Sequence, residues 1–148
     1  MTGIPEFRDT PQDRESVDEV RPTDRGQAPV WGEQREDVTG PVTRHGSWTV
    51  VPVIGDLDFL SAPELAEKVR SHTVEAAGPH RVVIDLHEVE YMDSTGLRIL
   101  LGMARDLREN GGALRLAGPG DLVVRLLDVT QVTPLLPTYT DVIAACRD

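Results

Sequence analysis

A strand, helix and strand pattern over residues 81–118 is the feature that most constrains the fold of this chain. The run RVVIDL, residues 81–86, is apolar and mostly β-branched, which is typical of a strand in the centre of a sheet. Apolar residues then recur at helical spacing from Leu97 to Leu107, the breaker ENGG follows, and ALRLAG, residues 113–118, indicates a second strand. Strands joined by a helical crossover of this length must be parallel, so the sequence predicts an α/β fold.

Two more elements are predicted before this unit. The segment SWTVVPVIGDL, residues 47–57, indicates a β-branched strand that a glycine ends, and Pro52 within it implies an edge position or a bulge. In the following SAPEL, Ser61 and Glu64 have the spacing of a capping box. This spacing predicts a helix that begins here and continues to about Ala76.

Another helix is predicted for DLVVRLLDV, residues 121–129. A short apolar piece follows, and we expect a last helix to begin at Thr140 with Asp141 in its first turn. The segment before Ser47 differs in composition, because it is rich in charge and proline and has no sustained helical or strand period. We therefore expect a disordered N-terminal extension over residues 1–46 and one folded domain over residues 47–148.

The composition excludes several classes of protein. With 25 acidic and 15 basic residues, the net charge of −10 disfavours binding to nucleic acid and leaves a protein or small molecule as the expected partner. No apolar run approaches the roughly 20 residues of a membrane-spanning helix, and the N-terminus lacks the pattern of a signal peptide. We therefore expect a cytoplasmic protein without membrane contact. The single cysteine, Cys146, cannot form an internal disulfide.

A polar cluster lies where the central strand gives way to the helix. Asp93, Ser94, Thr95 and Gly96 lie between this strand and the helix, at the edge where open α/β sheets bind their ligands. A helix N-terminus offers free N–H groups and partial positive charge, so it would accept a phosphate on Ser94. Arg98, one turn further, would add a cation or simply solvate the helix face. The purely structural interpretation is that Ser94 or Thr95 caps the helix and Gly96 keeps the turn small.

Enzymatic chemistry has little support in the sequence. The nucleophile elbow Gly-x-Ser-x-Gly is absent, and no pattern marks any of the four histidines as a base for Ser94. The acidic stretch DLHEVEYMD lacks the His-Glu-x-x-His spacing of a zinc site, and GPGDL is not a phosphate-binding loop. We therefore expect no catalytic residue, no metal and no cofactor.

Taken together, the motifs resemble one known family. The segments GDLDFLSAPEL (55–65), VVIDLHEVEYMDSTGLRILL (82–101), GGALRLAG (111–118) and VVRLLDVTQV (123–132) are similar to successive blocks of the STAS domain in the bacterial anti-sigma-factor antagonist family. The resemblance covers about Ser47 to Asp148. It implies a mixed β-sheet with helices packed mainly on one face.

The resemblance also implies a mechanism of partner switching. In this family the unmodified antagonist binds an anti-sigma factor that is also a serine kinase, and so frees a sigma factor. The kinase phosphorylates the serine after the motif aspartate, here Ser94, and the antagonist lets go; a PP2C-type phosphatase restores it. Asp58 matches the family's acid in the loop after the first long strand, near the phosphorylated serine.

The expected partner-binding residues come from that loop and from the polar cluster. They are Asp58, Ser61, Asp93, Ser94, Thr95, Gly96 and Arg98. At Arg98 the chain departs from the family, which often has glycine there, and this substitution puts the choice of kinase in question. An alternative function is a STAS module that senses a small ligand or acts as a scaffold in a stress-signalling assembly, with Ser94 only a helix cap.

Overall fold

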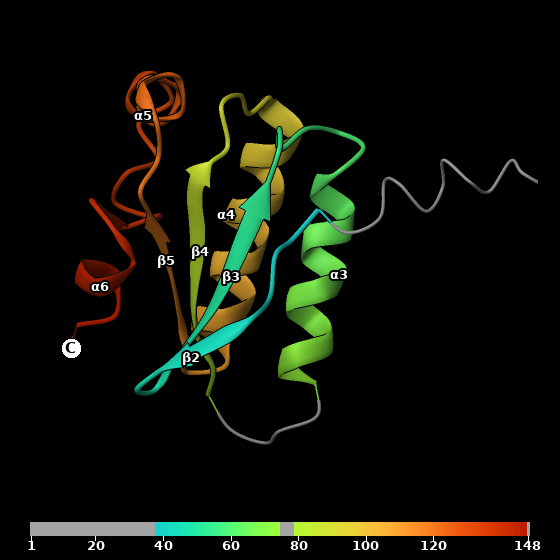
Figure 1. Ribbon diagram of the computed structural model, residues 1–148, viewed down its shortest axis with the longest axis vertical. Helices are drawn as coiled ribbons and strands as arrows, with labels where there is room; N and C mark the ends of the chain where they lie inside the picture. The colour runs from blue at the N-terminus through green and yellow to red at the C-terminus, as the bar shows by residue number, and fades with distance from the viewer. Residues whose placement is uncertain (1–37, 75–78, 148) are drawn as a thin grey trace, which may run out of the picture. The chain divides into compact units, whose positions relative to one another are not determined.

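The secondary structure is built around a five-stranded mixed sheet (Figure 1). The computed structural model describes residues 38–74 and 79–147. Its strands, in order across the sheet, are β2 (Thr43–His45), β3 (Trp48–Ile54), β4 (Arg81–Glu88), β5 (Ala113–Ala117) and β6 (Thr138–Tyr139). β2 is antiparallel to β3, and each of the other neighbouring pairs is parallel. The predicted α/β class and the central place of the strand that begins at Arg81 are confirmed.

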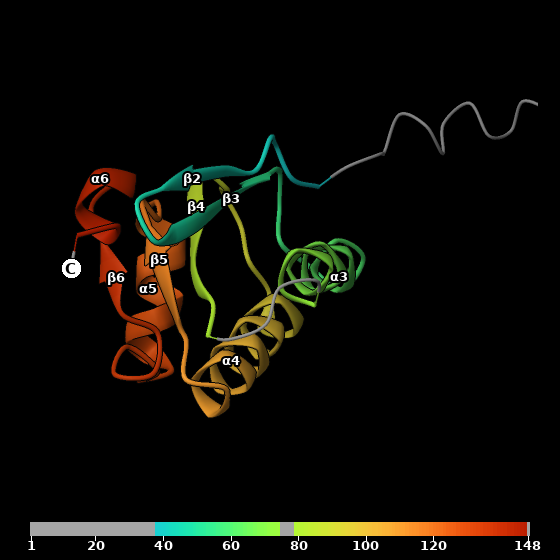
Figure 2. The same cartoon turned by 90° about the horizontal axis from the view of Figure 1, so that it is seen from below.

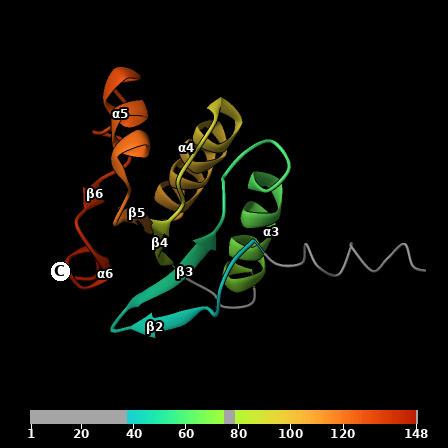
Figure 3. The same ribbon diagram turned by 45° about the horizontal axis from the view of Figure 1, so that its top comes forward.

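Helices connect the parallel strands, and a short helix follows the last strand. They are α3 (Ala62–Thr73) between β3 and β4, α4 (Ser94–Glu109) between β4 and β5, α5 (Asp121–Val129) between β5 and β6, and the short α6 (Val142–Ala145) after β6. Figure 2 shows α3 and α4 on one side of the sheet and α6 on the other. Figures 1 and 3 show the N-terminal ends of α3 and α4 at the same end of the sheet, where β3 and β4 finish. None of the helices in the described ranges has the length and hydropathy that a membrane crossing requires.

Successive side chains of β4 point to opposite faces of the sheet, and both faces are packed. Val82, Ile84 and Leu86 face the main core, where they meet the buried face of α4. That face is formed by Leu97, Leu100, Met103, Ala104 and Leu107. Leu100 is fully buried, which stabilises the fold by roughly 1.5–3 kcal/mol relative to an exposed leucine. Two residues of α5, Val123 and Leu127, join the same core, so the helices pack mainly on one face as expected.

The opposite face of the sheet holds a smaller core around Trp48, which α6 covers. The guanidinium groups of Arg81 and Arg115 lie over the Trp48 ring, with their central carbons 4.4 and 4.2 Å from the ring centre. Arg115 also donates hydrogen bonds to the carbonyl oxygens of Ala145 and Arg147, at 2.9 and 2.6 Å. A side chain of β5 therefore holds the end of α6 against the sheet.

The folded domain begins earlier in the chain than the sequence predicts. The sheet includes β2, which precedes the expected domain start at Ser47, and Thr39 forms a further bridge to Val53. All three residues of β2 are exposed, so no apolar alternation marks this strand in the sequence. The structure of residues 1–37, most of the expected disordered extension, lies outside the described residues.

Pro52 lies in an interior strand, because β3 has neighbours on both sides. The sequence predicts an edge position or a bulge for Pro52, and the second alternative is confirmed by a register shift between Pro52 and Ile54. The Pro52 carbonyl accepts from the Gly40 amide at 2.9 Å, so this residue directs its backbone groups away from β4. The missing N–H of proline consequently removes no hydrogen bond from the β3–β4 ladder.

The helix starts also differ from the predictions in detail. Ser61 precedes α3 as expected, but its side chain caps no N–H of that helix, so the capping box is wrong. The hydroxyl is instead used within the preceding loop. The predicted end of this helix, Ala76, lies outside the described residues. At the C-terminus α6 begins at Val142 rather than Thr140, because the Asp141 carboxylate caps it by accepting from the Ala144 amide at 2.8 Å.

Candidate functional site

Two loops are joined at the end of the sheet where the parallel strands finish. Leu57, in the loop after β3, donates its amide to the Tyr91 carbonyl at 3.0 Å and accepts from the Asp93 amide at 3.2 Å. This pairing makes an isolated parallel bridge between Leu57 and Met92. The Leu57 side chain is fully buried. The loop that carries Asp58 is thereby fixed beside the residues that lead into α4.

Gly96 allows the first turn of α4 to lie directly against this bridge. A Cβ atom at position 96 would stand 2.5 Å from the Leu57 carbonyl oxygen and 2.9 Å from Cγ of Met92. No side chain fits in that space without a shift of the backbone. The glycine that the sequence places in the polar cluster is therefore required by the contact between the two loops.

Asp93 is the residue that caps α4. Its backbone is extended, and its carboxylate accepts from the Gly96 amide at 2.9 Å. Ser94 is the first residue of the helix and is exposed, and its hydroxyl has no hydrogen-bond partner in residues 38–74 and 79–147. Thr95, the next residue, is partly buried. The interpretation of Ser94 or Thr95 as the helix cap is therefore wrong, because the aspartate before them takes that position.

The Asp58 carboxylate is held by the backbone of its own loop. It accepts from the Leu60 and Ser61 amides at 3.0 and 3.1 Å. These hydrogen bonds, above all the one from the Ser61 backbone, lower the pKa of Asp58 from its ordinary value. The Ser61 hydroxyl accepts from the Asp58 amide at 3.0 Å and donates to the Asp56 carbonyl at 2.8 Å. Ser61 thus builds the loop that presents an ionised Asp58.

Large apolar side chains in the same two loops are exposed. Phe59 and Leu60 follow Asp58 and are 65% and 63% exposed, and Tyr91, two residues before the α4 cap, is 51% exposed. We use the name loop surface for six residues of the two loops and the first two turns of α4: the half-buried Asp58 and the exposed Phe59, Leu60, Tyr91, Ser94 and Arg98. Sequence reasoning missed its apolar members, although the run LDFLSAPEL places two of them, Phe59 and Leu60, directly after a loop acid. Exposed apolar side chains grouped beside polar ones are typical of protein-binding surfaces.

Arg98 completes the loop surface on α4. It lies four residues after Ser94 and is exposed, and no residue of the described ranges forms an ion pair with its guanidinium. The structure thus brings together Asp58, Asp93, Ser94, Gly96 and Arg98 through the Leu57 bridge and the first turns of α4. Among the predicted partner-binding residues, Ser94 and Arg98 are exposed and Gly96 is buried; the others are partly buried, namely Asp58, Ser61, Asp93 and Thr95.

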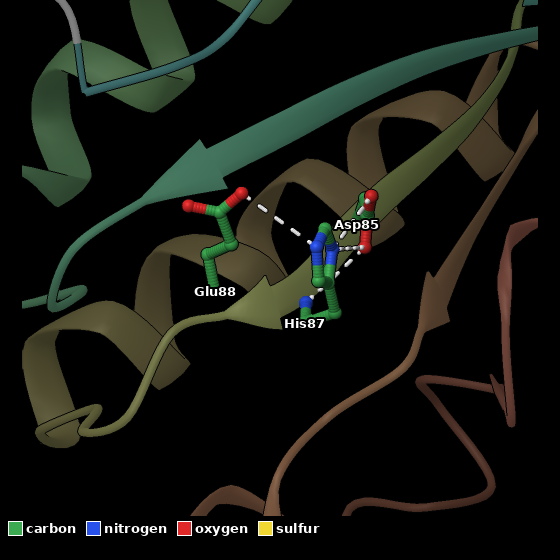
Figure 4. A network of polar contacts seen from close by, with 3 residues as sticks. All are labelled: Asp85, His87 and Glu88. Carbon is green, nitrogen blue, oxygen red and sulfur yellow. Dashed lines mark hydrogen bonds and ion pairs between the residues drawn. The ribbon is translucent and has the colours of Figure 1, made fainter.

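A separate polar network lies at the end of β4, as Figure 4 shows. His87 Nδ1 is 3.0 Å from Oδ1 of Asp85, and Nε2 is 3.6 Å from Oε2 of Glu88. The hydrogen bond with Asp85 and the charge of that carboxylate raise the pKa of His87. Two-residue spacing on one strand puts Asp85 and His87 on the same face, a signal that sequence reasoning did not use. In the part of the chain that the structure describes, no group of three or more His, Cys, Asp or Glu is arranged to hold a metal.

Comparisons with known proteins agree with this geometry. A family model, that of the STAS domain, matches residues 41–145. The anti-sigma-B factor antagonist of Staphylococcus epidermidis is 36% identical over 92 residues, which cover 62% of this chain and 83% of that protein. The anti-sigma-B factor antagonist of Bacillus subtilis (strain 168) is 34% identical over 86 residues, or 58% of this chain and 76% of that protein. Among solved structures, an anti-sigma factor antagonist from Mycobacterium paratuberculosis has a TM-score of 0.63 at 29% identity, over 72% of this chain and 88% of that chain. The chain therefore belongs to the STAS domain family, in its group of bacterial anti-sigma-factor antagonists.

Proposed function

We propose that the protein is a cytoplasmic anti-sigma-factor antagonist that works as a phosphorylation-controlled partner switch and not as an enzyme. In its unmodified form it binds an anti-sigma factor with serine kinase activity, so that a sigma factor is released. Phosphorylation of Ser94 abolishes this binding, and a PP2C-type phosphatase reverses it. One observation carries the proposal: Ser94 is exposed at the start of α4 while the structural task of capping the helix belongs to Asp93.

The fold tolerates a phosphate at this position. Because the Ser94 hydroxyl makes no hydrogen bond in the described residues, its modification breaks none there. The phosphate would also lie at the positive end of the α4 dipole, which favours negative charge. The free protein can therefore carry the modification without a rearrangement of the sheet or of the loops.

A docked partner, by contrast, would be expelled. A phosphoserine adds about −1.5 to −2 charges next to the ionised Asp58. A partner that fits the exposed Phe59, Leu60 and Tyr91 side chains would cover the site and exclude water from it. In such a desolvated interface, like charges and the added bulk weaken binding much more than they would in solvent.

The scaffold or small-ligand alternative loses its main support. It relied on Ser94 acting only as a helix cap, and the cap is Asp93. A helix that already has its cap gains little from a hydroxyl at the next position. The exposed Ser94 hydroxyl has no structural role in α4, whereas in the switch it is the group that is modified.

The proposal can be tested with substitutions at Ser94. Ser94→Ala should fold normally and keep its affinity for the anti-sigma factor, since it removes neither the cap nor any described hydrogen bond. Ser94→Asp should fold but lose at least about 1.4 kcal/mol of binding free energy, a tenfold change in affinity. Isothermal titration calorimetry with the anti-sigma factor encoded in the same genome would measure both affinities.

Thr95→Ala is the control, because this neighbouring hydroxyl is partly buried and should not be modified. Incubation of each variant with the kinase and ATP, followed by mass spectrometry, locates the phosphate. Phosphate on Thr95 in the wild type, or equal affinity of the Ala and Asp variants at position 94, would contradict the switch and favour the scaffold function.

A further inference from the structure

We propose that Arg98 binds the phosphate carried by Ser94, so that the modified protein holds its own phosphate in an ion pair on α4. This inference rests on the proposed function for the origin of the phosphate. It concerns a residue at which the chain differs from the glycine that its family often has. Arg98 would thus be a positioning residue for the phosphorylated state.

The helix sets the geometry of the pair. Ser94 and Arg98 are four residues apart in α4, so their side chains lie one above the other on the same face. Both residues are exposed, so neither must leave a packed position to meet the other. The order also matters, because an anion on the N-terminal side of a cation at this spacing is the more favourable arrangement.

No other described group competes for the Arg98 guanidinium. The neighbouring acid Asp93 directs its carboxylate to the Gly96 amide, and Asp58 accepts from the backbone of its own loop. Two other arginines have partners of their own, Arg70 with Glu67 and Arg115 with Trp48 and α6. Arg98 is without an ion pair in the described ranges and lies where a phosphate on Ser94 would arrive.

An ion pair between the phosphate on Ser94 and Arg98 would change the charge of the loop surface at both residues. The phosphate adds negative charge at Ser94, and the guanidinium, whose planar N–H groups match phosphate oxygens, is withdrawn from contact with a partner. A partner that uses the free Arg98 cation would lose it at the moment the phosphate arrives. The pair also offsets the repulsion between the phosphate and the nearby Asp58 and Asp93 carboxylates.

The test measures the phosphate itself. Full-length protein with phosphoserine installed at position 94 during translation is titrated by ³¹P nuclear magnetic resonance, which reports the second pKa of the phosphate. A nearby cation favours the dianion, so Arg98→Gln should raise this pKa by about 0.3 units or more. Arg98→Lys should keep most of the wild-type value, and high salt should reduce the difference between wild type and Arg98→Gln.

Arg105→Gln is the matched control, since Arg105 is an exposed arginine of the same helix, three turns from Ser94. An equal phosphate pKa in wild type and Arg98→Gln, or an equal shift in Arg105→Gln, would overturn the inference. Because the phosphoserine is installed without the kinase, the result does not depend on which residue the kinase modifies. A kinase that ignores Ser94 would refute the proposed function and leave the measured role of Arg98 unaffected.

Discussion

At the scale of single residues, neighbouring side chains of the site have different roles. Asp93 caps α4 and Ser94 begins it, so the Asp93 carboxylate stabilises the helix, whereas the exposed Ser94 hydroxyl has no part in the cap. A cap typically stabilises a helix by about 1 kcal/mol. Modification of a capping hydroxyl would put this stabilisation at stake, whereas modification of Ser94 would not. Ser61 and Asp58 also have different roles. The Ser61 hydroxyl bonds to the loop backbone, and the Asp58 carboxylate is the charged group that this loop carries.

A residue-scale prediction concerns His87. Its pKa is raised, first by the hydrogen bond with Asp85 and then by the charge of that carboxylate. We expect the proton resonances of His87 to titrate with a midpoint above the ordinary value of 6.5, and Asp85→Asn to lower that midpoint. Because the folded pKa exceeds the unfolded one, the stability from this pair is fully present below about pH 6.5 and is lost as the pH rises through the folded pKa.

Glu88→Gln is the control for this titration, because Glu88 lies further from the ring, at 3.6 Å, and is the smallest of the causes that raise the pKa. It should move the midpoint less than Asp85→Asn does. A midpoint that stays the same in Asp85→Asn would show that the pair of Figure 4 does not persist in solution.

At the scale of elements, α4 contains two glycines with opposite roles. Gly96 faces the Leu57 carbonyl, whereas an added Cβ at Gly102 would meet no heavy atom within 4 Å. Gly96→Ala should therefore destabilise the protein by about 1–3 kcal/mol through overpacking, despite the better helix propensity of alanine. Gly102→Ala should stabilise it by about 0.5–1 kcal/mol. Chemical denaturation of the two variants measures both effects, and a stabilised Gly96→Ala would disprove the close contact between the loops.

The elements also show what a sequence of this kind reveals. The strand at Arg81, the helix after Ser94 and the strand at Ala113 could all be predicted, because their buried faces leave a clear period of apolar residues. β2 could not, since its residues are all exposed and only its pairing with β3 defines it. The helix starts were predicted at the right turns, but Asp93 caps α4 in place of Ser94 or Thr95, and Ser61 precedes α3 without a side-chain cap. Asp, Ser and Thr are all good caps, and their backbone angles decide which of them takes the position.

In the candidate site too, only the residues that belong to a sequence motif could be predicted. Ser94, Asp58 and Gly96 were predicted because a motif carries them. The exposed Phe59, Leu60 and Tyr91 were missed, because nothing in a single sequence says whether a large apolar side chain in a loop is buried. The Leu57 bridge, which joins the two loops, consists of backbone hydrogen bonds and has no sequence signature at all.

At the scale of the whole molecule, the question is where the folded unit begins. Residues 38–42 run beside β3: the Ile54 amide donates to the Val38 carbonyl at 2.8 Å and the Gly40 amide donates to the Pro52 carbonyl at 2.9 Å. Val38 and Val42 pack against the main core. A chain of residues 47–148 lacks all of these contacts together with β2, whereas a chain of residues 37–148 keeps them.

We therefore predict that the two truncations differ in stability. The chain 37–148 should unfold within about 0.5 kcal/mol of the full-length protein, because it retains every contact of the described unit. The chain 47–148 should be at least about 2 kcal/mol less stable, since each lost backbone hydrogen bond costs about 1 kcal/mol and the buried area of two valines is exposed as well. Urea denaturation followed by fluorescence of Trp48, which both chains keep, gives the comparison. Equal stability of the two truncations would mean that the segment before Ser47 only borders the fold, and a loss of stability already in 37–148 would mean that the first 36 residues contribute to it.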